Sequence, residues 1–209
     1  MSPTRFWVCL LFFVFVTHLH EPGPFTGWAK ERERTESPAE SIKKSPTFHQ
    51  RVEGFPLALS AGEMEALLDD LPYASSLLNR YKIHTLTVVR DGDLYTADDQ
   101  KGVKGTFSLL AREGAFREYQ GAGTIENSLV GRISAEVVAS IRYTPVEAYL
   151  IRNDLEFWVL VNNSFIDFLC RLFNPMLKGV LKSNVENLVL MVQQLAIAVR
   201  SSGDDVLAP

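Results

Sequence analysis

The sequence predicts an α+β domain in which an antiparallel sheet is followed by one long C-terminal helix. Six stretches between residues 83 and 161 alternate apolar and polar residues, and short segments rich in turn residues connect them, as in an antiparallel meander. After Asn163 the apolar spacing becomes three and four, which is typical of an amphipathic helix. The 209 residues, 46% of them hydrophobic, allow one domain of about 150 residues.

Both ends of the chain differ from this pattern. Arg5 precedes an apolar run from Phe6 to Val16, as in an export signal, and this run is shorter than the roughly 20 residues that span a bilayer. We expect residues 1–20 to be a cleaved signal peptide or a retained signal anchor. Residues 21–53 mix Pro, Ser and both charges without an apolar period, which predicts a disordered spacer before a domain at 54–203 and a disordered tail at 204–209.

The domain is expected to open with a short strand and two short helices. "FPLAL" at 55–59 is the strand candidate, and Ser60 with Glu63 forms the pattern of a capping box that starts a helix. Pro72 ends that helix, and "YASSLLNRY" predicts a second one. Six further strands are predicted at 83–89, 93–98, 104–112, 115–125, 132–143 and 147–161.

The C-terminal part predicts a short helix at 164–173 and a long one from Asn174, which is followed by Pro175, to about Arg200. The long helix carries one apolar stripe, and its burial would contribute on the order of 10–20 kcal/mol of gross apolar free energy. The stripe consists of Leu177, Leu181, Val185, Leu188, Val192, Leu195 and Val199.

The order of these elements over residues 55–200, with the strings "YTADDQKGVKGTF", "RISAEVVASIRY" and "NNSFIDFLCRLFNPMLKGVL", resembles uncharacterised exported bacterial members of the START-like helix-grip superfamily. This SRPBCC group contains lipid-binding and polyketide-cyclase-type proteins. The resemblance implies a curved sheet wrapped around the last helix, with an apolar cavity between them. The segment 164–173 departs from the family pattern and is expected to cover or plug one mouth of that cavity.

Alternation sorts the large side chains between the two faces of the sheet. Phe157 shares its face with Leu155 and Val159 and is expected to point inward, whereas Trp158 points outward with Glu156 and Leu160. Such residues form plain core as well as ligand pockets. The expected cavity-lining residues are Leu86, Phe107, Tyr119, Phe157, Val159, Leu181, Leu188 and Val192.

The sequence offers little for other kinds of chemistry. The histidines lack metal-ligand spacing, so no metal or cofactor is expected, and no catalytic residues stand out. The net charge of −4 without a basic stripe argues against a nucleic-acid partner. "DGDLYTADD" is better explained as a hairpin turn than as a calcium loop, because the later ligands are missing.

These patterns lead to three functional hypotheses. The first is an exported or membrane-tethered domain that binds a lipid or another apolar small molecule. It would lie in the periplasm or be anchored to the inner membrane on the periplasmic side. Its partners would be that molecule and, if the N-terminal segment is not cleaved, the membrane. The second is a structural or protein-interaction domain whose own side chains fill the cavity. The third is an enzyme of the cyclase or hydrolase type.

Overall fold

The computed structural model describes residues 37–127, 131–162 and 174–202, with four helices and one seven-stranded sheet among them. The sheet is antiparallel throughout, with the strand order β1-β7-β6-β5-β4-β3-β2. Its strands are β1 (Phe48–Leu57), β2 (Thr87–Asp91), β3 (Leu94–Asp98), β4 (Val103–Glu113), β5 (Phe116–Asn127), β6 (Gly131–Glu147) and β7 (Leu150–Val161). The helices are α2 (Pro38–Lys44), α3 (Ala61–Asp69), α4 (Leu71–Arg80) and α6 (Asn174–Ser202).

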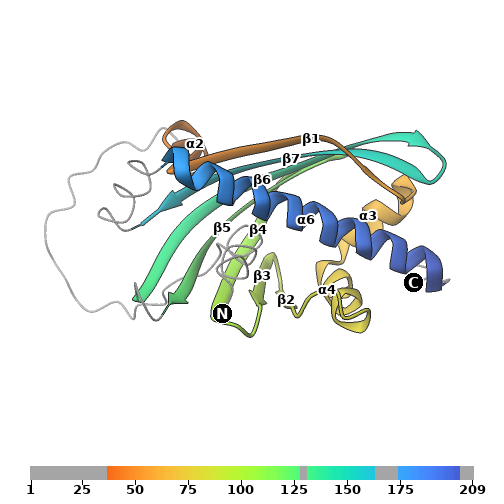
Figure 1. Ribbon diagram of the computed structural model, residues 1–209, viewed down its shortest axis with the longest axis horizontal. Coiled ribbons are helices and arrows are strands. Elements are labelled where there is room, and N and C mark those ends of the chain that lie inside the picture. The colour runs from red at the N-terminus through yellow and green to blue at the C-terminus, as the bar shows by residue number, and fades with distance from the viewer. Residues whose placement is uncertain (1–36, 128–130, 163–173, 203–209) are drawn as a thin grey trace, which may run out of the picture.

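The predicted helix-grip α+β fold is confirmed. The long sheet strands curve, and α6 runs across their inner face (Figure 1). In the part of α6 whose side chains are described, Leu188, Leu195 and Val199 are buried in the main core, as the apolar stripe predicts. That core joins the inner face of the sheet to α3, α4 and α6.

The two short helices after the first strand are also confirmed, and local capping explains where each begins. Ser60 Oγ accepts a hydrogen bond from Glu63 N at 3.2 Å, while the Glu63 carboxylate accepts one from Ser60 N at 2.6 Å. Asp70 then caps α4 by accepting from Tyr73 N at 2.9 Å, and Pro72 occupies the first turn.

The predicted domain boundary at residue 54 is wrong, and so is the spacer prediction for the stretch from Pro38 to Glu53. Helix α2 begins at Pro38, and β1 begins at Phe48 rather than at residue 55. The first part of β1 was missed because its register shifts between Val52 and Phe55, which breaks the alternation of apolar residues. Helix α2 has only seven residues, with two of them buried, so it shows no apolar period.

The strand predicted at 83–89 begins later, at Thr87. The side chain of Asn79 in α4 accepts a hydrogen bond from Leu86 N and donates one to Leu86 O, which ties this segment to the helix. Ile83 N likewise donates to Leu78 O at 3.0 Å. These bonds use backbone groups that a strand ladder would need. The hairpin turn predicted at "DGD" is confirmed between β2 and β3, with Gly92 at a φ of 59°.

Helix α2 covers part of the outer face of the sheet. Ala39 and Ile42 pack on Val138, with Trp158 and Leu160 beside them, so Trp158 points outward as predicted. Lys43 Nζ lies 2.7 Å from a carboxylate oxygen of Glu118 and 5.2 Å from the centre of the Trp158 ring. The sheet is therefore covered on both faces at this end.

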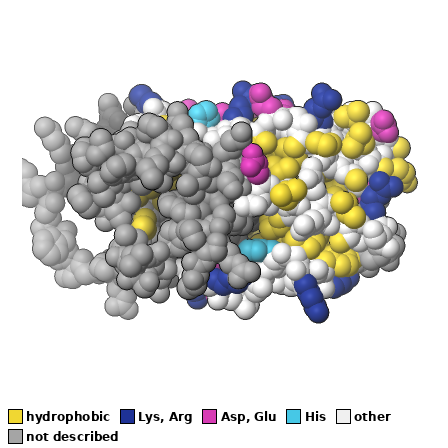
Figure 2. Space-filling view, viewed as in Figure 1, with side chains coloured by type: hydrophobic (Ala, Val, Ile, Leu, Met, Phe, Trp, Pro, Cys, Tyr) yellow, Lys and Arg dark blue, Asp and Glu magenta, His cyan; other side chains and the backbone are white. Residues whose placement is uncertain are grey.

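Several predictions fall outside the described residues: the export segment 1–20, the spacer up to residue 36, the helix at 164–173 and the tail at 204–209. None of the described helices has the length and apolarity needed to cross a membrane. Hydrophobic side chains reach the surface at the end of the molecule where α6 finishes (Figure 2). Leu190 and Ile197 on α6 are more than half exposed.

Candidate functional site

A cavity of about 220 Å³ lies between the inner face of the sheet and the helices. Its size lies between the roughly 150 Å³ of an engineered cavity that binds benzene and the 300–1,000 Å³ of pockets for drug-sized ligands. Its position is the one that the helix-grip resemblance implies.

The sheet supplies one wall of the cavity through inward-facing positions of β1 and of β4 to β7. Antiparallel partners share a face, so Ala139 on β6, which is paired with Phe157 on β7 and Tyr119 on β5, continues one row of the wall. The lining residues on these strands are Phe55, Leu57, Phe107, Tyr119, Ala139, Ile141, Asn153, Leu155 and Phe157.

The helices supply the opposite wall. On α6, the step from Leu188 through Met191 and Val192 to Leu195 keeps one stripe facing the sheet. Ala196 on α6 lines the cavity beside this stripe. The other contributions come from α3, α4 and β2 and from the segments that follow β1 and precede β2. These residues are Leu59, Met64, Leu67, Leu68, Leu71, Ala74, Ser75, Leu78, Leu86 and Val88.

The structure brings six of the eight predicted lining residues together. These are Leu86, Phe107, Tyr119, Phe157, Leu188 and Val192. Val159 does not line the cavity, because β1 begins early enough for Phe48 to pair with Val159 and cover it in a separate cluster with Ala135 and Val137. Leu181 lies outside the residues whose side chains the structure describes.

Three of the described lining residues have polar side chains: Ser75, Tyr119 and Asn153. Ser75 Oγ donates to Pro72 O at 2.8 Å and accepts from Val88 N at 3.2 Å, so its hydroxyl is used within the fold. Burial raises the pKa of Tyr119 to about 12, so this phenol is neutral at physiological pH. The Tyr119 ring meets Phe107 edge to face, with 6.1 Å between the centroids.

The third polar group is Asn153 in β7, which sequence reasoning missed. Its cross-strand partners are Phe55 on β1 and Tyr143 on β6, and its side chain is fully buried. Neither Nδ2 nor Oδ1 has a hydrogen-bond partner among the described residues. Because Asn153 lies two residues before Leu155 in the strand, alternation places both on the inward face. It was missed because polar residues are usually expected on the outward face.

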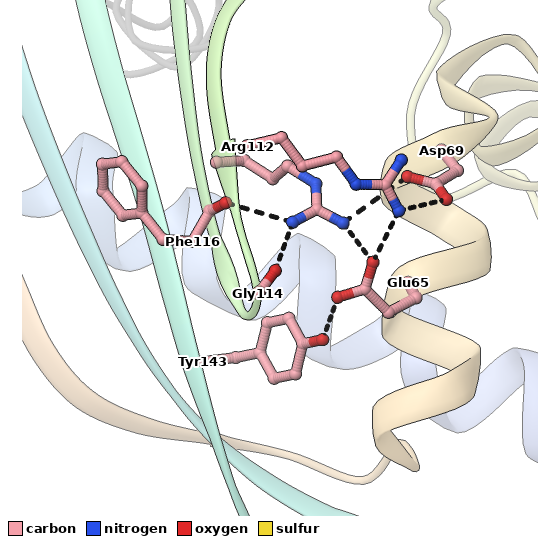
Figure 3. A network of polar contacts seen from close by, with 7 residues as sticks. Glu65, Asp69, Arg112, Gly114, Phe116 and Tyr143 are labelled. Atoms are coloured by element: carbon pink, nitrogen blue, oxygen red, sulfur yellow. Dashed lines mark hydrogen bonds and ion pairs between the residues drawn. The ribbon is translucent and has the colours of Figure 1, made fainter.

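A network of charged side chains joins the sheet to α3 (Figure 3), and its residues are not among those that line the cavity. Arg117, buried on β5, contacts the Glu65 carboxylate and donates to Gly114 O at 2.5 Å. Arg112 lies 2.8 Å from Asp69, and the Tyr143 hydroxyl donates to Glu65. Burial, followed by this bond to Glu65, raises the pKa of Tyr143 to about 12, which keeps it a neutral donor.

These groups limit the chemistry of the described site. No charged side chain is among the described lining residues. Tyr119 is the one residue among them with an ionisable side chain. Over the same described part of the chain, no group of three or more His, Cys, Asp or Glu side chains gathers as metal ligands do. The wall that the structure describes is thus suited to apolar contact with a few neutral hydrogen bonds.

Comparison with known proteins supports the fold and does not identify a reaction or a ligand. No family description matches the sequence, and no curated protein matches it either. A conserved protein from Geobacillus kaustophilus has a similar structure, with a TM-score of 0.51 and 15% identity, covering 73% of this chain and 97% of that one.

Two enzymes of similar structure have lower TM-scores. The Zhui aromatase/cyclase from Streptomyces sp. R1128 has a TM-score of 0.43 and 12% identity, covering 75% of this chain and 99% of that one. Norcoclaurine synthase from Thalictrum flavum has a TM-score of 0.45 and 10% identity, covering 85% of this chain and 99% of that one. At these identities the likeness concerns the fold alone.

Proposed function

We propose that this protein is a binding domain for an apolar small molecule held between the sheet and α6. The observation that carries the proposal is the cavity of about 220 Å³, whose described wall is apolar apart from three neutral side chains. Pockets of this composition gain affinity from excluding apolar surface from water and take orientation from their few polar groups. The distribution of groups favours binding over catalysis, because no acid–base pair converges on the described part of the wall.

We also propose that the domain works outside the cytoplasm, exported or tethered to the membrane. The basis is Arg5 followed by the apolar run from Phe6 to Val16, which has the composition of an export signal. A lipid remains one candidate ligand for a protein in that place.

Filling the cavity tests the binding proposal. Ala139 faces the cavity from β6, so Ala139→Phe would place a ring in the space that the ligand needs. The neighbouring change Ser140→Phe adds the same ring on the other face of the sheet and serves as the control. Native mass spectrometry of the purified full chain is expected to show a non-covalent small-molecule adduct on the wild type and on Ser140→Phe, and none on Ala139→Phe. An adduct of the same occupancy on all three proteins would refute the proposed site.

A protein-interaction function is the second candidate, and exposed apolar side chains favour it. Leu190 and Ile197 on α6 are 53% and 59% exposed, and Tyr149 beside β7 is 58% exposed. If this surface rather than the cavity is the functional one, exchanging Leu190 and Ile197 for Ser should abolish partner capture while leaving small-molecule binding unchanged.

A further inference from the structure

The buried carboxamide of Asn153 says more about the ligand than the apolar wall does. Asn153 lines the cavity, is 0% exposed, and has neither a donor for Oδ1 nor an acceptor for Nδ2 among the described residues. Most buried polar groups in folded proteins are hydrogen-bonded, so a carboxamide with both ends unused calls for a specific explanation.

The described neighbours of Asn153 do not pair with its carboxamide. Its neighbours on the inward face of β7 are Ile151 and Leu155, and its partner on β1 is Phe55. Tyr143, its partner on β6, donates its hydroxyl to Glu65 instead. The remaining polar lining group for which bonds are known, Ser75, is bonded to the backbone on both sides.

We propose, on the basis of the binding function proposed above, that the ligand is a compact, neutral molecule whose single polar group hydrogen-bonds to Asn153. A carboxamide offers two donors and one acceptor oxygen, so the matching group both donates and accepts, as a hydroxyl, an amide or a protonated carboxyl does. The rest of the molecule is apolar, because the wall around it is apolar.

The ligand is neutral because the described wall holds no opposite charge. Arg117, the buried cation among the described residues, is bound to Glu65 and to the Gly114 carbonyl, and it does not line the cavity. An ion brought into this space would lose its hydration without gaining a charged partner, which is far more costly than burying a neutral group. The volume of about 220 Å³ favours a one- or two-ring molecule over a lipid with two long chains.

Three probes of nearly equal shape test this inference on the full chain. Naphthalene has no polar group, 2-naphthol adds one neutral hydroxyl, and 2-naphthoate adds a negative charge at pH 7.5. Equilibrium dialysis gives a Kd for each. We expect 2-naphthol to bind at least about five-fold more tightly than naphthalene and at least about ten-fold more tightly than 2-naphthoate.

The variant Asn153→Leu replaces the carboxamide with an apolar group of the same branching. The ratio of the naphthalene Kd to the 2-naphthol Kd is expected to fall by about five- to a hundred-fold in this variant. Arg152→Leu, which introduces the same side chain at the neighbouring exposed position, should leave the ratio unchanged. The melting temperature of Asn153→Leu should equal or exceed that of the wild type, because an unpaired buried polar group is removed.

The possible outcomes separate this inference from the binding function on which it rests. If no probe binds to the wild type, the proposed cavity function itself fails. If naphthalene and 2-naphthol bind but Asn153→Leu leaves their ratio unchanged, binding stands and the role of Asn153 is refuted. A lower melting temperature for Asn153→Leu would show that the carboxamide already has a partner in the protein, and tight binding of 2-naphthoate would refute a neutral ligand.

Discussion

Arg117 is the largest side chain among those that the described fold buries completely, and its charge is held by the network around Glu65. Its Nη1 donates to the carbonyls of Gly114 and Phe116, and its Nη2 donates to Glu65. Its Nε has no partner among the described residues. Removing one member of a buried ion pair leaves an uncompensated charge, which costs about 3–5 kcal/mol. Glu65 thus fixes α3 to the sheet through one buried arginine.

Glu65→Leu should therefore lower the free energy of unfolding by about 2–3 kcal/mol, because Arg117 and the Tyr143 hydroxyl both lose the Glu65 carboxylate and Arg117 keeps only the longer ion pair with Asp69, at 3.6 Å. Arg112→Leu changes the same network at a side chain that is 51% exposed, where water already screens the charge, so a much smaller loss is expected there. Urea unfolding followed by circular dichroism measures both. Similar losses for the two variants would mean that the burial of Arg117 has no special energetic weight.

Sequence patterns predicted the apolar side chains of the site better than the polar ones. Alternation placed Phe157 inward, Phe107 and Tyr119 were expected to line the cavity with it, and all three do so. Arg117 shares a strand face with Tyr119, and Asn153 shares one with Leu155, so the same parity pointed inward at both. They were missed because a polar residue at an inward position looks like a break in the alternation. The sequence of one strand also does not show which residue of another element, such as Glu65 on α3, will pair with it.

At the scale of elements, α2 and the first half of β1 belong to the folded domain. Ile42 packs on the outer face of the sheet, Phe48 covers Val159 on the inner face, and Thr47 N donates to Val159 O at 2.7 Å. The strands β3 to β7 and helix α6 were predictable because regular periods of two or of three and four run through them. The start of β1 was not, because its bulge interrupts the period, and the misplacement of Val159 follows from that single error.

A chain that begins at residue 54 should consequently be much less stable than one that begins at residue 37. The longer deletion removes Ile42 and Phe48, which are 1% and 8% exposed, and the loss of two such side chains costs about 3–6 kcal/mol of gross burial. That is a large part of the 5–15 kcal/mol available to a domain. Urea midpoints of the two chains give the comparison, and equal midpoints would show that α2 and early β1 are dispensable.

At the scale of the whole molecule, the described domain begins at residue 37 and the apolar run lies well before it, at 6–16, so changes in that run should affect location without affecting folding. Replacing Leu11 and Phe13 with Asp breaks the apolar core of the proposed export signal, and the chain should then stay in the cytoplasm. Replacing Thr26 and Thr35 with Asp adds the same charges between run and domain and should leave export intact.

Fractionation of bacterial cells that express each chain measures this, and the mass of the exported wild type distinguishes a cleaved signal peptide from a retained anchor. The 2-naphthol affinity of each purified chain shows whether the domain has folded, since a cavity between sheet and α6 exists only in the folded state. Export of the Leu11 and Phe13 variant at the wild-type level would refute the proposed location, while leaving the proposal for the cavity in place, because the two depend on separate parts of the chain.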